Sequence, residues 1–273
     1  MLLKKFFNKS IVYFLLFIIS VFFIFPILWL FLTSFKNPIE ATNPWSLPSS
    51  IRISNYVAAF NTGNFSNAFI NTIIIGLFSV GLSLILGFPI AYAISRFRNK
   101  FNNCLISTFL TLRILPEMLF LLPLYVIFRY SGLFDTYLGM TLTFQILLLP
   151  LTVLLLKNFI NEIPKEIEES AKIDGASDLL IILKIVVPLT LPGIVVVSIF
   201  GFILVWTNLL FPLALSYSNA STVSVAIAGF KGYGSFNWPI MCAAALIITI
   251  PQVILFAFIS KYLVEGLASG SIK

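Results

Sequence analysis

Long apolar runs constrain the fold of this chain more than any other feature of its sequence. A run of about 18 or more residues with few charges can cross the hydrocarbon core of a bilayer as a helix, and several such runs occur here. Apolar residues make up 59% of the 273 residues and charged residues 10%, whereas soluble domains hold about 45–50% and about 25%. The sequence therefore predicts an all-α membrane protein, with one membrane domain over residues 1–273 and no soluble domain.

Six membrane spans are predicted from the positions of these runs. The first is longer than a signal-peptide core and has no small-x-small cleavage site, so it is expected to stay in the protein. The second repeats a small residue every four positions, which lets another helix approach closely. These small residues are Ser79, Ser83, Gly87, Ala91 and Ser95. The expected spans are about 11–33, 68–94, 104–128, 136–156, 185–215 and 239–262.

Lysine and arginine are distributed unequally between the two sides of these spans. Twelve of the 17 lie in the amino terminus, the loops after spans two and four, and the tail. The opposite loops hold four, which are Lys36, Arg52, Arg129 and Lys231. The positive-inside rule then places both termini and the loop after span four in the cytoplasm. This orientation explains the net charge of +7 without nucleic-acid binding.

The loop after span four contains the one long stretch that mixes charge with an ordered pattern, residues 163–192. Pro164 suits the first position of a helix, where its missing N–H costs nothing. Three carboxylates follow in the first turns and favour the positive end of the helix, namely Glu166, Glu168 and Glu169. Gly175 fits a C-terminal cap in the left-handed conformation. The pattern predicts a helix of about ten residues, which is too short to span a bilayer.

One face of this short helix carries Ile163, Ile167 and Ala171 at i, i+4 and i+8, beside the small Ser170. A helix of this length is not stable alone in water. We therefore expect it to dock against another surface.

The same residues resemble a known family signature. Glu169-Ser-Ala171, then Gly175 and Ile185-Val-Val-Pro188, are similar to the EAA signature of ATP-binding-cassette importer permeases. Ser170 replaces the usual first Ala and Val187 replaces Leu, and both changes conserve size. In that family the segment forms a cytoplasmic coupling helix, between spans four and five, that sits in a groove of the ATPase subunit. The alternative is a merely amphipathic helix in a cytosolic loop.

The resemblance implies partners and site residues. The implied partners are a second permease subunit, cytoplasmic ATP-binding subunits, an extracytoplasmic solute-binding protein and membrane lipid, in the cytoplasmic membrane of a prokaryote. The implied ATPase-coupling residues are Glu168, Glu169, Ser170, Ala171, Asp174, Gly175 and Pro188.

Shorter motifs along nearly the whole chain resemble the smaller, six-span permease of maltose-type sugar transporters, so the implied solute is a sugar, an oligosaccharide or glycerol phosphate. They are Pro26-Ile-Leu-Trp29, Thr33-Ser-Phe-Lys36, Pro48, Asn55-Tyr56, Asn71-Thr72, Ala91-Tyr-Ala93, Arg96-Phe97-Arg98, Leu122-Pro-Leu-Tyr125, Gly132-Leu133, Asp135-Thr-Tyr-Leu-Gly139 and the closing pattern of residues 261–273.

Four polar residues inside the spans are candidates for the translocation path. Arg113 and Glu117 are spaced i, i+4 in span three, where a carboxylate offsets part of the cost of burying an arginine. The pair either lines a polar path or braces the bundle. Thr207 and Asn208 follow Trp206 in span five, where the family often shows Trp-Asn-Glu or Trp-Asn-Asp. They either line the path or form hydrogen bonds between helices.

The sequence also excludes several classes of function. No Gly-x4-Gly-Lys-Ser/Thr motif occurs, so energy must come from a partner or an ion gradient. Histidine is absent, and Cys104 and Cys242 lack metal-ligand spacing, so no catalytic residue, metal or cofactor is expected. An ion-coupled secondary transporter is the alternative, since such carriers place ionisable groups at mid-membrane. A membrane-embedded enzyme is disfavoured. Among importers, an amino-acid or phosphate permease is the alternative to a carbohydrate permease.

Overall fold

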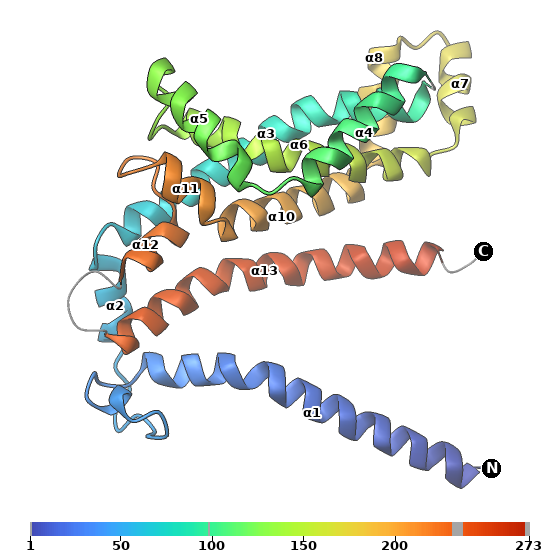
Figure 1. The fold of residues 1–273 in the computed structure, drawn as a ribbon. Helices are drawn as coiled ribbons and strands as arrows, with labels where there is room; N and C mark the ends of the chain where they lie inside the picture. The colour runs from blue at the N-terminus through green and yellow to red at the C-terminus, as the bar shows by residue number, and fades with distance from the viewer. Residues whose placement is uncertain (1, 98, 231–236, 271–273) are drawn as a thin grey trace. The chain divides into compact units, whose positions relative to one another are not determined.

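The computed structural model describes residues 2–97, 99–230 and 237–270, and side-chain environments within residues 11–258. Its described elements are helices, without a strand among them, which confirms the all-α prediction (Figure 1). The helices divide into two compact units. Unit 1 comprises Met1–Phe65 and Ile227–Ile250, and unit 2 comprises Ser66–Ala226 and Pro251–Lys273. The single membrane domain over 1–273 stays a prediction.

Unit 1 is built on α1 (Leu2–Ser34), the short α2 (Ser54–Asn61) and the first part of α13 (Trp238–Gly270). The buried amide of Asn55 fixes the chain where α1 ends, because its Nδ2 donates to the carbonyl oxygens of Ser34 at 2.7 Å and Lys36 at 2.9 Å. The Ser34 hydroxyl also lies 2.8 Å from that of Tyr56. The two Asn55 bonds satisfy carbonyls at and just after the end of the helix, where intrahelical partners are missing.

Unit 2 contains most of α3 (Phe65–Arg96), then α4 (Lys100–Ile114), α5 (Met118–Ser131), α6 (Tyr137–Asn161) and α10 (Leu191–Thr207). The small residues of α3 meet α6 directly. The Ser83 hydroxyl lies 2.7 Å from that of Thr152, and Gly87 faces the Thr152 methyl group. The predicted close approach of a second helix to this stripe is therefore confirmed.

Two of the predicted spans are broken helices. The third is divided into α4 and α5, which meet at an angle of 99°. Leu115, which precedes Pro116, is extended, as a residue before proline prefers to be, and this conformation ends α4. The fifth is divided at Thr190 between residues 178–189 and α10, with a bend of 72°. A further short helix, α11 (Leu210–Leu215), follows Asn208.

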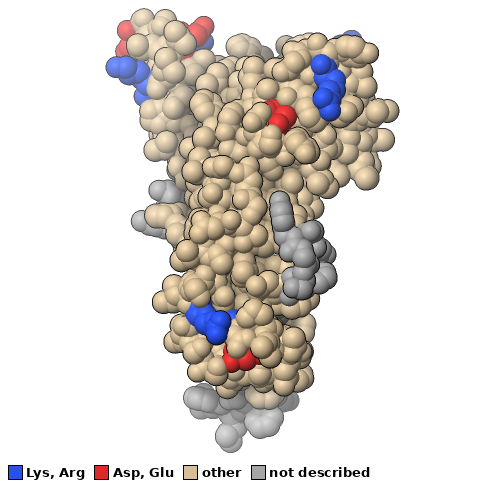
Figure 2. Space-filling model, turned by 90° about the vertical axis from the view of Figure 1, so that its left-hand side faces the viewer, with Lys and Arg blue, Asp and Glu red and all other residues tan. Residues whose placement is uncertain are grey.

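The number of spans stays between four and six in the described residues. Four helices are long and apolar enough to cross a membrane, or up to six if each bent pair counts as one span. On the face drawn in Figure 2, the coloured Lys, Arg, Asp and Glu side chains form small groups among described residues that are uncharged. The prediction of six spans stays a prediction.

The segment between the fifth and sixth predicted spans contains α12 (Val223–Gly229), and its first residues are held by one carboxylate. Asp135 accepts hydrogen bonds from the backbone N–H groups of residues 217–220, at 2.9 to 3.3 Å. Burial opposes ionisation, but these donors outweigh it and hold the pKa of Asp135 below its usual value. Asn71 on α3 adds bonds to the carbonyls of Asn219 and Ser221.

Three sequence expectations fall outside the described residues. Arg98 and Lys231 are two of the basic residues used for orientation, and the closing pattern of residues 261–273 has no described side chain.

Candidate functional site

The charged segment after α6 folds into α7 (Lys165–Ile173) and α8 (Asp178–Ile181). Pro164 is the residue before α7 rather than its first helical residue. Gly175 has φ +84°, its N–H donates to the carbonyl of Lys172, and the next N–H donates to that of Ala171. This pair of bonds closes a helix at a left-handed glycine. The predicted cap at Gly175 is confirmed.

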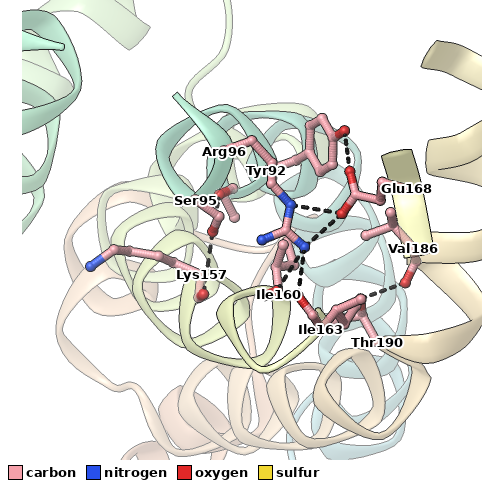
Figure 3. A network of polar contacts seen from close by, with 10 residues as sticks. Tyr92, Ser95, Arg96, Lys157, Ile160, Ile163, Glu168, Val186 and Thr190 are labelled. Carbon is pink, nitrogen blue, oxygen red and sulfur yellow. Dashed lines mark hydrogen bonds and ion pairs between the residues drawn. The ribbon is translucent and has the colours of Figure 1, made fainter. Parts of the chain in front are cut away.

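One carboxylate of α7 points into the protein. Glu168 is buried, with 5% of its surface exposed, and accepts bonds at both oxygens (Figure 3). Arg96 Nη2 lies 2.6 Å from Oε1, and the Tyr92 hydroxyl donates to Oε2 at 2.7 Å. Both partners lie on the last turns of α3, one helical turn apart. Glu168 therefore joins α7 to the end of α3.

Arg96 also contacts the end of α6. Its Nη2 donates to the carbonyl oxygens of Ile160 at 3.0 Å and Ile163 at 3.2 Å, where α6 has ended or is ending (Figure 3). A cation is favourable at this negative end of a helix, where carbonyls lack intrahelical partners. One guanidinium thus ties together α3, α6 and α7.

The opposite side of α7 is exposed. Glu169, Ser170, Ile173 and Asp174 are exposed, and Ile173 has 86% of its surface exposed despite being apolar. A single exposed apolar residue is common on protein surfaces, so Ile173 alone does not identify a contact surface. These four residues are called the outer face of α7 below.

The remaining coupling candidates occupy three other environments. Ala171 is half-buried against the apolar cluster that α3, α6 and α10 share, and Ile163 is buried in that cluster, whereas Ile167 is 41% exposed. Gly175 closes the helix, and Pro188 is exposed at the start of α9 (Val187–Leu189). The segment therefore separates into a buried anchor at Glu168 and an exposed outer face, a division that its sequence does not indicate.

An exposed ion pair connects α7 to α8. Lys172 Nζ lies 2.8 Å from Asp178 Oδ1, and this contact raises the pKa of Lys172. Both side chains are more than half exposed, so the pair contributes little to stability.

The predicted pairing of Arg113 with Glu117 is not found in the structure. Pro116 and the extended Leu115 end the helix between the two residues, so they are not neighbours on one helical face. Arg113 is exposed, and Glu117 instead accepts a hydrogen bond from Asn208 Nδ2 at 2.9 Å. Both residues of this new pair lie at helix breaks, since Asn208 separates α10 from α11. The hydrogen bond therefore connects the break between α4 and α5 to the break between α10 and α11.

The two candidates after Trp206 differ from each other. The Thr207 hydroxyl donates to carbonyls of its own helix, at Ile203 and Leu204, and its side chain is exposed. Asn208 accepts a bond from the Phe211 N–H at the start of α11 in addition to its bond to Glu117. Of the two, Asn208 forms the hydrogen bond between helices that is the alternative to a role in the path.

Sequence reasoning did not assign Tyr92, Arg96 or Asp135 to the site or its support. Tyr92 and Arg96 share a face of α3 at i, i+4, and this spacing is the sequence signal that was overlooked. For Asp135 the signal was weaker, because an aspartate in a short loop usually bonds its own neighbours, whereas this one bonds a loop more than 80 residues away.

Comparison with known proteins places residues 79–269 in a family model described as "Binding-protein-dependent transport system inner membrane component". The matched region contains Arg96, α7 and the helix breaks at Leu115, Thr190 and Asn208.

Two curated relatives match over most of their length. The trehalose transport system permease protein SugB of Mycobacterium tuberculosis is 37% identical over 251 residues, which cover 91% of this chain and 92% of that protein. The melibiose/raffinose/stachyose import permease protein MelC of Bacillus subtilis is 34% identical over 250 residues, which cover 91% of each chain.

A solved structure has the same fold. It is a chain of a bacterial ABC transporter involved in the import of the acidic polysaccharide alginate, with a TM-score of 0.79 and 22% identity. The match covers 95% of this chain and 97% of that one.

Proposed function

Because the chain belongs to the family of binding-protein-dependent transport system inner membrane components, we propose that it is a transmembrane permease subunit of an ATP-driven carbohydrate importer. In this proposal the chain forms half of the translocation path and takes its energy from a separate ATPase. The resemblance of its sequence to importer permeases is confirmed by the family match, and the chain is a multi-pass inner-membrane protein.

The carbohydrate assignment is supported by the relatives. Their names record trehalose for one and melibiose, raffinose and stachyose for the other, both at more than 30% identity over nine-tenths of the chain. We propose a sugar, an oligosaccharide or glycerol phosphate as the solute. A permease for a non-sugar solute is the alternative.

The observation that carries the coupling proposal is the two-sided environment of α7. Its inner side is fixed to α3 and α6 through the buried Glu168–Arg96 pair, while its outer face leaves Ile173 exposed. A helix fixed in this way transmits a force applied to its outer face to α3 and α6. We propose that the ATPase subunit binds the outer face, and that its closure on ATP moves α3 and α6 through Arg96.

This assignment gives the residues different roles. Glu169, Ser170 and Asp174 contact the ATPase, Gly175 sets the turn, and Glu168 acts as the internal link. Pro188 begins the helical turn that leads back to the membrane. The other proposed partners are a second permease subunit and an extracytoplasmic solute-binding protein, with both termini of this chain in the cytoplasm.

The proposal is tested by purifying the tagged chain gently from native membranes and identifying what accompanies it. Recovery of an ATPase, a second permease and a solute-binding protein is the expected result. A ligand screen of that binding protein then distinguishes sugars from other solutes. Recovery of the chain alone, with uptake that an ionophore abolishes and ATP does not affect, would identify an ion-coupled transporter instead.

A further inference from the structure

Unit 1 contains a cavity of about 650 Å³ that the transport proposal does not use. It lies where α1 ends, and α13 begins on its other side. Its lining residues are Phe25, Pro26, Trp29, Leu30, Thr33, Lys36, Ala41, Thr42, Pro44, Trp238 and Cys242.

A buried ammonium group lines this cavity. Only 1% of Lys36 is exposed, and its Nζ donates to the carbonyl oxygen of Pro44 at 3.3 Å and lies 4.8 Å from the Trp29 ring centroid. Among the described side chains, no carboxylate lies within ion-pair distance of it. An ammonium group has three donors, and a buried charge without an anion is costly. The cavity therefore favours an anionic occupant.

A second polar group in the same lining lacks a partner. Thr33 is more than nine-tenths buried, and its hydroxyl oxygen has no hydrogen-bond partner in the structure. Buried hydroxyl groups are nearly always hydrogen-bonded. An occupant that supplies acceptor oxygens would satisfy Thr33 and Lys36 together.

The cavity changes from polar to apolar along α1. Thr33 and Lys36 lie at the end of α1, and Thr42 lies in the segment that follows it. Phe25 lies eight residues before Thr33 on the same helix, about 12 Å away at the rise of an α-helix. Trp29 and Trp238 flank the polar part, and tryptophan is enriched where membrane helices reach the headgroup level. A free anion or a sugar would leave the apolar part unfilled. A phospholipid has both parts in this order.

We propose that this cavity binds an anionic phospholipid, with its phosphate on Lys36 Nζ and Thr33 Oγ1 and an acyl chain along Phe25 and Leu30. Lysine binds phosphate groups as a point charge, which fits the single buried ammonium group of this cavity. The exposed apolar flank of α1, from Ile11 to Leu28, lets the rest of the lipid continue into the bilayer. This site does not depend on the coupling role of α7.

Native mass spectrometry of the delipidated, assembled complex, titrated with phosphatidylglycerol, measures the site directly. Lys36→Met keeps most of the side-chain volume and should weaken retention of one lipid about tenfold or more. Thr33→Val has nearly the same shape and should weaken it several-fold. Arg52→Gln removes a charge from an exposed residue of unit 1 outside the cavity lining and should change nothing.

Two comparisons identify the ligand. Phosphatidylcholine should bind more weakly than phosphatidylglycerol, and equal binding would overturn the role of charge. Inorganic phosphate at millimolar concentration should not displace the lipid, and full displacement would identify a free-anion site instead.

If Lys36→Met disturbs folding, Thr33→Val still distinguishes a lipid-binding site from an empty packing void. In a void, removing an unpaired hydroxyl would leave lipid retention unchanged and would not lower the unfolding temperature. That result would overturn the proposal. Loss of phosphatidylglycerol retention, together with loss of the stabilisation that added phosphatidylglycerol gives to wild type, supports it.

Discussion

At the scale of single residues, the fold depends on a few charged groups that are buried with partners distant in sequence. Glu168 and Arg96 are 72 residues apart, and their side chains are 7% and 8% exposed. Such a pair adds little stability compared with apolar residues of similar size, but removing one member leaves a charge buried without compensation. The pair is therefore better suited to fixing α7 in one position than to stabilising the protein.

Arg96→Met should destabilise the complex by about 3–5 kcal/mol, because it leaves the buried Glu168 without its cation. The double variant Arg96→Met with Glu168→Leu should recover most of that loss, since the buried charge is gone. Thermal unfolding of the purified complex measures both. Lys172→Met, which breaks the exposed pair with Asp178, is the control and should cost less than about 1 kcal/mol. Equal losses of stability from Arg96→Met and Lys172→Met would contradict the idea that the buried Arg96–Glu168 pair fixes α7 in position.

Asp135 gives a pH-dependent prediction. Its pKa in the folded protein is lowered, so its contribution is complete above the unfolded value of about 3.9 and is lost as pH falls through the lowered folded value. Asp135→Asn should lower the unfolding temperature at neutral pH, and the difference from wild type should shrink below about pH 4. A difference that stays constant down to the acid limit of the assay would show that the carboxylate charge is not the cause.

At the scale of elements, the positions of the two ends of α7 can be predicted from the sequence, because a proline and a glycine determine the backbone conformation there. Pro164 and Gly175 lie just outside the helix on either side, within one residue of the predicted positions. Its orientation cannot be read in the same way. Three glutamates occupy the first turns, and which one turns inward depends on Arg96, at the end of another helix.

Gly175 should tolerate substitution only by residues that accept a positive φ. Gly175→Ala should cost about 1–2 kcal/mol from backbone strain alone, since its Cβ would meet no atom within 4 Å. Gly175→Asn should cost less, because asparagine also closes helices in this conformation. Gly175→Pro cannot adopt φ +84° and loses the bond to Lys172, so ATP-driven uptake should be abolished while the protein still inserts. Wild-type uptake by Gly175→Pro would contradict a coupling role for this turn.

Two glycines of α3 provide a matched test of its packing against α6. A Cβ on Gly87 would lie 2.7 Å from the Thr152 methyl carbon, whereas one on Gly81 would meet nothing within 4 Å. Gly87→Ala should therefore destabilise by about 1–3 kcal/mol through overpacking. Gly81→Ala should be neutral, or stabilise by up to about 1 kcal/mol through helix propensity. The unfolding temperatures of the two variants should move apart, and equal shifts would contradict the observed helix contact.

At the scale of the whole molecule, the apolar runs predict where membrane helices lie but not where they break. Pro123, Pro150 and Pro251 sit inside continuous helices, whereas Pro116 marks a bend of 99°. A proline in a membrane helix is tolerated when neighbouring groups satisfy the freed backbone, so its effect depends on tertiary contacts that sequence does not display. The bond between Glu117 and Asn208 is a contact of this kind, and the i, i+4 reading of Arg113 and Glu117 did not foresee it.

Binding of the ATPase to the outer face of α7 can be tested by cross-linking. The two native cysteines are replaced by serine, and one cysteine is introduced by Ser170→Cys on the outer face or by Ser131→Cys at the exposed end of α5. A thiol-reactive photo-cross-linker is then activated in the complex purified with its partners. We expect Ser170→Cys to form an adduct with the ATP-binding subunit and Ser131→Cys to form none. An ATPase adduct from Ser131→Cys, with none from Ser170→Cys, would show that the ATPase does not bind the outer face of α7.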